Sequence, residues 1–323
     1  MSNIKFFICP STKNIVDAVI SFNELETDNI GLIPTRRQVD WDGGYANNWT
    51  TKNFCEYTKD LFLGRDHAGP LQGYKEDDGY ESLAYDCNHF KLIHLDPWKK
   101  FPAYKDGLHA TVNMLEFCFE KNHNIEYEIG TEEGIRPFTI DETKIFLKDL
   151  YQILDFDIFK KIKFMVVQSG TIVKETKNFG QHNPKKLKET IKLAKEYNLS
   201  TKEHNGDYLG YSLIKEKMDI GLDSINIGPE ISVIETQTYL DIINSKMFDT
   251  YWRLCYDSHR WERWVNNNFN PVENKRKLIE ICGHYVVNTP TFINEIKNNL
   301  PNIDDIIQSN ILNRLNLLIY GRD

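Results

Sequence analysis

The chain carries FKLIHLD at residues 90–96 and IEYEIGTE at residues 125–132, with a helical pattern over residues 104–122 between them. Each of the two runs mixes apolar and β-branched residues and ends abruptly in polar ones, which is typical of a strand that leads into a loop. A strand, a helix and a second strand in this order form the unit from which parallel sheets are built. This stretch therefore predicts an α/β fold with a parallel sheet.

The same unit repeats along most of the chain, and eight strand–helix units favour a (β/α)8 TIM barrel. An open, doubly wound sheet is the alternative, but no G-x-G-x-x-G follows the first strand and no P-loop occurs anywhere. The expected strands lie at residues 4–9, 29–34, 61–66, 90–96, 125–131, 163–169, 199–205 and 224–229. The expected helices lie at residues 11–23, 50–59, 76–87, 104–122, 140–155, 183–197, 208–219 and 230–245.

The strand signal disappears after residue 245, and the rest of the chain has helical patterns only. We therefore expect a barrel over residues 1–245 and a C-terminal helical extension over residues 246–323 that packs on the barrel. Asn-rich and proline-containing segments interrupt the extension, because the residue before proline leaves the helical region. The expected helices of the extension lie at residues 246–266, 273–286, 290–298 and 302–319.

Composition limits the kinds of partner that the protein has. The 323 residues carry a formal net charge of -8, and the lysine clusters at 160–163 and 185–188 are typical of solvated helix faces, so no nucleic-acid partner is expected. No apolar run approaches the roughly 20 residues that span a membrane, and no signal peptide opens the chain. The six cysteines form no C-x-x-C pair and are expected to be reduced. A cytoplasmic protein with no membrane contact is expected.

Several strands end in polar residues, as LFLGRDH (61–67), FMVVQSG (164–170) and LSTKEHNGD (199–207) show. In a parallel barrel the carboxyl ends of all strands open on one face, and this face holds the ligand site. Carboxylates, imidazoles and an amide at successive strand ends would therefore point into one pocket. This pattern predicts an active site.

Strand alternation predicts which of these side chains point inward. His94 and Asp96 share a face with Leu92, and Glu126, Glu128 and Glu132 share a face, while the residues between them suit packing against helices. A buried carboxylate needs a partner, which can be a metal, a histidine or a cationic group of the substrate. The alternative is an exposed edge strand with solvated glutamates, but a closed barrel has no edge.

Asp66 and His67 close the third strand, and His204 lies at the end of the seventh. Two imidazoles and an inward carboxylate such as Glu128 can hold Zn²⁺ and leave positions open for a substrate. The carboxylate of Asp66 can move protons at the same centre. An Asp that caps a loop beside an internally satisfied His is the alternative for this pair.

Other polar residues suit substrate binding. Gln168, Ser169 and Gly170 follow the sixth strand in a form that can hydrogen-bond a hydroxyl or phosphate. Gly228 follows the eighth strand, where barrels often bind phosphate. Arg36 and Arg37, after the second strand, are planar cations that can clamp a phosphate or carboxylate, although either can equally form a surface ion pair.

Seven short motifs occur in a fixed order along nearly the whole chain. They resemble those of the GatZ/KbaZ-like family, which is named for the large subunit of tagatose-1,6-bisphosphate aldolase and is often mislabelled as a tagatose-6-phosphate kinase. The motifs are GGY (43–45), LGRDHAGP (63–70), KLIHLD (91–96), IGTE (129–132), VVQSG (166–170), EHNGDY (203–208) and NIGPEIS (226–232).

The resemblance implies roles for individual residues, because the family looks like class II, metal-dependent aldolases. By this likeness Asp66 transfers a proton, His67 and His204 bind zinc, and Glu132 or Glu133 exchanges the proton on the carbon next to the carbonyl. The remaining zinc histidine of those enzymes falls where this chain has Gln168, and an amide is a poorer zinc ligand than imidazole.

The resulting hypothesis is a metal-dependent aldolase or epimerase that acts on a phosphorylated ketose through an enediolate or retro-aldol intermediate. His67, Glu128 and His204 would hold the metal, most simply zinc, while Asp66 and Glu132 would carry protons. His94, Asp96 and Gln168 would orient hydroxyls. Phosphate would be held by Ser169, Gly170, Asn226, Gly228 and Arg36.

The alternative hypothesis is a non-catalytic subunit that stabilises a separate class II aldolase, the role ascribed to the tagatose-aldolase subunit of the family. Gln168 favours this alternative, whereas the inward glutamates oppose it. The protein is expected to associate with copies of itself or with such an aldolase partner.

Overall fold

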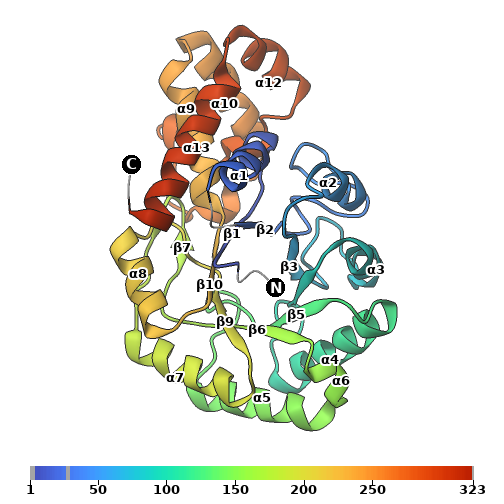
Figure 1. The fold of residues 1–323 in the computed structure, drawn as a ribbon. Helices are drawn as coiled ribbons and strands as arrows, with labels where there is room; N and C mark the ends of the chain where they lie inside the picture. Colours follow the sequence, from blue (N-terminus) through green and yellow to red (C-terminus); the bar gives the residue numbers. More distant parts are fainter. Residues whose placement is uncertain (1–3, 27–29, 322–323) are drawn as a thin grey trace.

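Eight parallel strands surround a central axis, and helices cover the outside (Figure 1). The structure is a computed structural model and describes residues 4–26 and 30–321. The first residue of the strand expected at 29–34 therefore lies outside the described residues. The strands of the barrel are β1 (Phe6–Ile8), β2 (Gly31–Leu32), β3 (Gly64–Ala68), β4 (Leu92–Leu95), β5 (Glu126–Ile129), β6 (Ile162–Val166), β9 (Ser200–Glu203) and β10 (Ser224–Ile227).

The sheet closes on itself. Its hydrogen-bonded order is β2-β1-β10-β9-β6-β5-β4-β3, and every pairing within it is parallel. Two parallel bridges, Leu32 with Leu63 and Thr35 with Asp66, join the chain at β2 to the chain at β3. This confirms the predicted (β/α)8 barrel, and the open sheet is excluded because its two edges meet.

A helix follows each strand, as the alternating pattern predicted. Thr12, Thr50, Thr139 and Asn183 begin four of them, because each side-chain oxygen accepts the backbone N–H three residues later. A short helix, α6 (Phe156–Phe159), and a hairpin of β7 (Val173–Lys174) and β8 (Lys177–Asn178) were not predicted. The outer helices are α1 (Lys13–Leu25), α2 (Thr51–Tyr57), α3 (Tyr80–His89), α4 (Tyr104–Lys121), α5 (Ile140–Ile153), α7 (Pro184–Glu196), α8 (Tyr211–Ile220) and α9 (Pro229–Ile242).

The chain after the barrel is helical, and its last helix lies against α1 and α9 (Figure 1). The helix expected over residues 246–266 ends at Asp257, because His259 adopts a positive φ of 55° and turns the chain. The division at residue 245 stays a prediction. The elements are α10 (Ser245–Asp257), η1 (Glu262–Trp264), α11 (Lys275–Cys282), η2 (Gly283–Tyr285), α12 (Pro290–Glu295), η3 (Lys297–Asn299) and α13 (Ile303–Tyr320), in which η marks a 3₁₀ helix.

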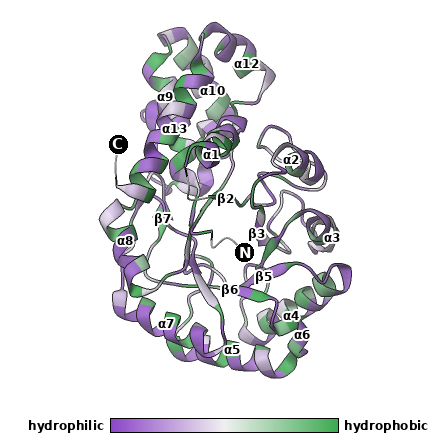
Figure 2. Ribbon diagram, viewed as in Figure 1, coloured by the Kyte–Doolittle hydropathy of each residue, from purple (hydrophilic) through white to green (hydrophobic). Residues whose placement is uncertain are grey.

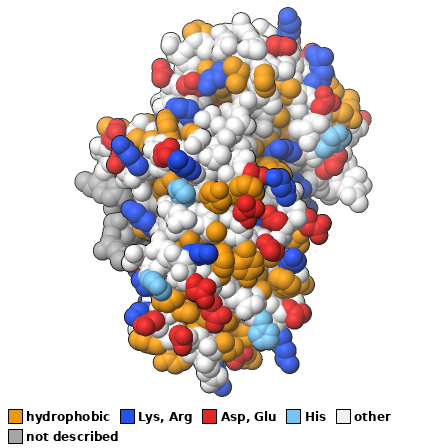
Figure 3. All heavy atoms as spheres, turned by 90° about the vertical axis from the view of Figure 1, so that its right-hand side faces the viewer, with side chains coloured by type: hydrophobic (Ala, Val, Ile, Leu, Met, Phe, Trp, Pro, Cys, Tyr) orange, Lys and Arg blue, Asp and Glu red, His pale blue; other side chains and the backbone are white. Residues whose placement is uncertain are grey.

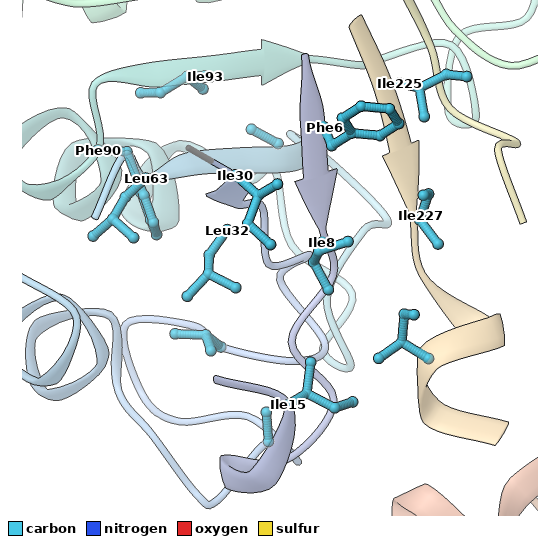
Figure 4. Close-up of a cluster of buried hydrophobic side chains, with 14 of the residues drawn as sticks. Phe6, Ile8, Ile15, Ile30, Leu32, Leu63, Phe90, Ile93, Ile225 and Ile227 are labelled. Carbon is cyan, nitrogen blue, oxygen red and sulfur yellow. The ribbon is translucent and has the colours of Figure 1, made fainter. Parts of the chain in front are cut away.

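Strand alternation separates two buried apolar clusters. The larger lies between strands and helices and contains Phe6, Ile8, Ile225 and Ile227 (Figure 4). The smaller fills the inside of the barrel, and its members are Ile4, Phe7, Cys9, Ile33, Leu92 and Phe164.

The predicted directions of the side chains on β4 and β5 are confirmed. Leu92 belongs to the inner cluster, whereas Ile93, Tyr127 and Ile129 belong to the outer one. Glu128 is fully buried inside the barrel. Because one face of each strand packs against helices, the other must face the barrel axis.

The outer surface is mixed in polarity. The ribbons of the outer helices carry both hydrophilic and hydrophobic residues (Figure 2), and acidic and basic side chains are interspersed on the face shown in Figure 3. The six cysteines, all within the described residues, form no disulfide. Among the described helices, none is long and apolar enough to cross a membrane.

Three helices meet over a buried carboxylate, Glu235 of α9. Thr12 donates its hydroxyl to Glu235, and the amide of Asn14 donates to Glu235 Oε1 at 3.0 Å and to Asp304 Oδ1 of α13 at 2.9 Å. Burial raises the pKa of Glu235 to about 7, and the hydrogen bonds from Thr12 and Asn14 offset only part of this effect. This contact therefore ties the last helix to the barrel in a way that depends on pH.

We expect the variant Glu235→Gln to gain stability relative to the wild type as the pH rises. The unfolded chain ionises Glu235 near its ordinary pKa of about 4.5, whereas the folded protein keeps the proton up to about 7. The folded state binds more protons between these values, so wild-type stability falls across this range. Urea unfolding from pH 4.5 to 7.5 should show the difference grow by up to about 3 kcal/mol.

The exposed Glu196→Gln on α7 is the matched control and should track the wild type at every pH. A constant difference between Glu235→Gln and the wild type over the whole range would contradict the prediction.

Candidate active site

Asp66 and His67 both reach the centre of the barrel because β3 carries a bulge. Between Arg65 and Ala68 the pairing of β3 with β4 shifts by one residue, and His67 adopts a positive φ of 45°. In a regular strand two neighbouring side chains point to opposite faces, so His67 would face the helices. The extra residue turns it inward, and such unusual backbone geometry is typical of functional sites.

Three imidazoles meet at the carboxyl ends of β3, β4 and β9. The ring centroids lie 4.9 Å apart for His67 and His94, 5.2 Å for His67 and His204, and 4.6 Å for His94 and His204. One donor atom from each ring and one oxygen of Asp66 all lie within 4.8 Å of one another. These four side chains therefore offer three nitrogen ligands and one oxygen ligand to a single point.

In each imidazole, the ring nitrogen that points away from the centre of the cluster contacts a hydrogen-bond acceptor. A ring nitrogen that faces such an acceptor carries the proton, so the other nitrogen of the neutral ring presents a lone pair to the cluster. This support of the outer nitrogen is typical of histidines that bind metals. The contacts are His67 Nδ1 to Asp96 Oδ2 at 2.6 Å, His94 Nε2 to the Gly130 carbonyl at 3.0 Å, and His204 Nε2 to Glu128 Oε1 at 2.6 Å.

Two carboxylates face the inner nitrogens. Asp66 Oδ1 lies 3.4 Å from His94 Nδ1 and 3.5 Å from His204 Nδ1. Glu132 Oε1 lies 2.9 Å from His67 Nε2 and 3.6 Å from His204 Nδ1. Since His94 Nδ1 also accepts the backbone N–H of His67 at 3.2 Å, the cluster is tightly connected.

Opposite charges dominate the ionisation of these groups. Burial alone would raise the pKa of Asp66, but the imidazoles of His67 and His204 outweigh it and lower the pKa to about 2. Burial alone would lower the pKa of His204, but Asp66 and Glu128 raise it to about 9. Burial acts against charge on His67 and Glu132 as well, yet Asp66, Asp96 and Glu132 raise the pKa of His67. His204 and His67 lower the pKa of Glu132 in the same way.

An ion pair lies below the imidazoles, inside the barrel. Lys202 Nζ lies 2.8 Å from Glu128 Oε2, and both side chains are fully buried. The ammonium group also lies 4.0 Å from the centre of the Phe7 ring and 5.6 Å from that of Phe164. Glu128 therefore uses one oxygen for Lys202 and the other for His204.

A cavity of about 320 Å³ opens above the cluster, and Asp66, His67, Glu132 and His204 line it. Ser11 forms part of the wall, where its hydroxyl accepts from Gln38 at 3.2 Å and from Ser232 at 2.6 Å. Pockets of this size with a few convergent polar groups are typical of small-molecule sites. The remaining wall includes Arg37, Tyr45, Lys99, Asp207, Gly228, Arg263, His284 and Tyr285.

Of the eight residues predicted to bind substrate, Gly228 alone lines this cavity. His94 and Asp96 belong to the imidazole cluster below it, and Arg36 and Gln168 lie elsewhere. Arg36 is buried, does not line the cavity, and donates to Asp40, Asp77 and the carbonyl of Gly69. Gln168 lines a separate cavity of about 20 Å³. Its amide donates to the carbonyls of Thr131 and Arg136 and accepts the N–H of Phe138, so it holds the loop after β5.

Three of the residues predicted to bind phosphate, Ser169, Gly170 and Gly228, also have their polar groups occupied by other contacts. Ser169 donates to Glu203 at 2.9 Å and accepts from the buried Lys217 at 2.7 Å. Gly170 donates its N–H to Glu133 at 3.1 Å. Gly228 lines the cavity, but its N–H donates to Asp207 at 2.9 Å. The amide of Asn226 is buried and has no hydrogen-bond partner among the described residues.

Sequence reasoning missed the role of Lys202 and gave His94 a lesser one. Lys202 shares a strand face with His204, so the alternation of β9 carried a signal for it. His94 was expected to point inward, yet nothing along the chain shows that its ring meets those of His67 and His204. Of the two arginines after β2, Arg37 lines the cavity and the predicted Arg36 does not.

The fold of this barrel is shared with solved structures of aldolases and of a sugar epimerase. No protein-family model and no curated protein matches the chain. A probable tagatose 6 phosphate kinase from Sinorhizobium meliloti 1021 is 15% identical, with a TM-score of 0.74 over 97% of this chain and 98% of that one.

Two enzymes with specific names are also similar in structure. The fructuronate-tagaturonate epimerase UxaE from Cohnella laeviribosi is 11% identical, with a TM-score of 0.65 over 99% of this chain and 82% of that one. The YdjI aldolase from Escherichia coli K12 is 14% identical, with a TM-score of 0.52 over 88% and 89%. At such identities the likeness establishes the fold alone, and membership of the GatZ/KbaZ-like family stays a prediction.

We expect Lys202→Met to destabilise the protein by about 3–5 kcal/mol, because it leaves Glu128 buried beside His204 without its cation. Guanidinium unfolding measures this. The matched control is Lys192→Met on the exposed face of α7, which should change stability by less than about 0.5 kcal/mol. Equal effects of both substitutions would show that the ion pair contributes little.

Proposed function

We propose that the protein is a metal-dependent enzyme that cleaves or epimerises a ketose derivative. The observation that carries the proposal is the group of three imidazoles, His67, His94 and His204, each supported from outside by an acceptor. The aldolase and epimerase names of the structural neighbours support the same class of chemistry.

The residues present fit a divalent metal. His204 Nδ1 is buried and has no hydrogen-bond partner among the described residues, so a ligand would satisfy it. Asp66, Asp96, Glu128 and Glu132 surround the imidazoles, and Lys202 is the one lysine that pairs with them in the described chain. A divalent cation would compensate this excess of negative charge, and nitrogen-rich sites of this kind suit zinc.

The ligand set in this proposal differs from the one predicted by sequence. His94 replaces Glu128 as the third ligand, because both oxygens of Glu128 already bond to the charged groups of Lys202 and His204. His94 Nδ1 accepts only the backbone N–H of His67 at 3.2 Å, and it would exchange this contact for the metal. Glu128 instead orients His204. The absence of a histidine at residue 168 is then no obstacle, since three imidazoles converge without it.

The metal, when bound, supplies a Lewis acid that polarises the carbonyl of the substrate. Asp66 lines the cavity beside the imidazoles and would exchange a proton with the substrate hydroxyl next to the bond that breaks. Glu132, on the loop after β5, would exchange the proton on the carbon beside the carbonyl. Re-addition after rotation of the cleaved aldehyde gives epimerisation, so one site supports either outcome.

We expect the purified wild type to hold about one divalent metal per chain, and His67→Ala, His94→Ala and His204→Ala each to lose most of it. Each substitution removes one of the three nitrogen ligands, and the affinity for zinc depends on the number and geometry of its protein ligands. Elemental analysis after dialysis measures this, and the exposed His109→Ala is the control.

Gln168→Ala should keep its metal, because the amide contacts only the loop after β5. Metal retention by all three imidazole variants would remove the proposed site. A wild type that never takes up metal would favour the non-catalytic partner-subunit alternative.

Asp66→Asn and Glu132→Gln should separate the two proton transfers. In the metal-loaded protein, Glu132→Gln should lose exchange of the α-proton of a three-carbon ketone fragment with deuterium from solvent. Asp66→Asn should keep this exchange but cleave or epimerise the full ketose about 10²–10⁴-fold more slowly. Proton NMR in D₂O follows both reactions, and identical behaviour of the two variants would contradict the separate roles.

A further inference from the structure

One wall of the cavity is cationic. Arg37 from the loop after β2, Lys99 from the loop after β4 and Arg263 from η1 all line it. Arg37 is half-buried, whereas Lys99 and Arg263 lie exposed at the rim. These residues come from three distant parts of the chain, so only the folded protein brings them together.

Arg37 has no acidic partner within the described part of the chain. The one hydrogen bond that its side chain makes within the described residues runs from Nε to the carbonyl of Gly73 at 3.4 Å, and no ion pair there includes it. The neighbouring Arg36 differs, because Asp40 and Asp77 take up its donors. The two terminal nitrogens of Arg37 are therefore available to a ligand, and a guanidinium fork suits a carboxylate or phosphate.

The cations on this wall repel one another. Burial lowers the pKa of Arg37, and the nearby Arg263 lowers it further. Burial likewise lowers the pKa of Lys99, and both arginines add to the effect. His284 lines the same wall with no partner for its Nδ1 in the described chain, and burial and Arg263 lower its pKa to about 3, so it adds no charge.

The part of the cavity wall at the start of α9 is unsuitable for an anion. Asp207 Oδ1 accepts the backbone N–H groups of Gly228 at 2.9 Å and Glu230 at 2.8 Å, which begin α9. These are the groups that would otherwise bind a phosphate at the start of a helix. Burial and the nearby Glu230 raise the pKa of Asp207 to about 8, because this end of the cavity already has an excess of acidic groups.

We propose that Arg37, with Lys99 and Arg263 at the rim, binds the anionic end of the substrate, a carboxylate or phosphate remote from the reacting carbonyl. This inference rests on the proposed function, because it assumes that the carbonyl end lies at the imidazoles. The cationic wall then determines specificity for a ketose that carries a terminal negative charge.

The C-terminal extension takes part in this recognition. Arg263 and His284 belong to η1 and η2, and Tyr285 of η2 packs against Tyr45 with ring centroids 4.7 Å apart. Tyr45 lies 3.5 Å from Ser11 through its hydroxyl, so the wall offers hydroxyl groups next to the cations. The helices after the barrel therefore complete the substrate pocket.

Binding of small unreactive probes tests the inference without any need for turnover. Calorimetric titration of the metal-loaded protein with glycerol 3-phosphate, glycerate and glycerol compares a phosphate, a carboxylate and a neutral analogue. We expect at least one anion to bind about tenfold or more tightly than glycerol, because a hydrogen bond to a charged group is stronger than a neutral one. The tighter anion identifies the terminal group.

Arg37→Gln should weaken binding of that anion by about tenfold or more, with metal content unchanged. Arg263→Gln, at the exposed rim, should weaken it by a few-fold and provides a second variant if the first does not fold. The control is Arg253→Gln, which removes the same charge from an exposed position on α10 and should bind like the wild type.

Equal anion binding by Arg37→Gln and the wild type would overturn the inference, as would equal binding of all three probes by the wild type. If the anion binds through Arg37 but the protein holds no metal, the cationic site stands and the proposed function fails. If metal binding depends on the three imidazoles while anion affinity does not depend on Arg37, the inference fails and the proposed function stands.

Discussion

The ion pair between Lys202 and Glu128 lies where the inside of the barrel changes from apolar to charged. Below it, the rings of Phe7 and Phe164 fill the barrel, and the ammonium group packs over both. Above it, the second oxygen of Glu128 holds His204. A buried carboxylate is tolerated only with a partner, so the position of His204 depends on Lys202 and on the packing around it. Stability of the barrel and geometry of the site are therefore coupled through one contact.

The cavity above this contact has groups of different charge on its different sides. Carboxylates and imidazoles form its floor. Cations with no acidic partner among the described residues form one wall, and the capped start of α9 forms another. A substrate with a carbonyl at one end and a negative charge at the other would fit in one direction only. Such orientation lowers the entropic cost of reaction, because the reacting groups are held in place before chemistry begins. The helical extension contributes Arg263 to this cationic wall.

Part of the site followed from strand alternation. The inward direction of Glu128 and His94 was predicted correctly, because Tyr127, Ile129 and Ile93 had to face the helices. The same rule fails for Asp66 and His67, since neighbours in a regular strand face opposite ways. The bulge that turns both inward is a property of the pairing between β3 and β4. In a loop the side chains do not alternate in direction, so strand alternation could not distinguish Arg36 from Arg37.

The sequence by itself determined the barrel and the polar residues at its strand ends, because apolar periodicity and turn residues act over short distances along the chain. Only the tertiary structure decided which of these residues meet one another and which of them line the cavity. Glu128 and Lys202 are 74 positions apart, and Arg263 lies far beyond the barrel. Whether a carboxylate can bind a metal or instead orients a histidine depends on which groups contact its oxygens. Packing between distant parts of the chain determines those contacts.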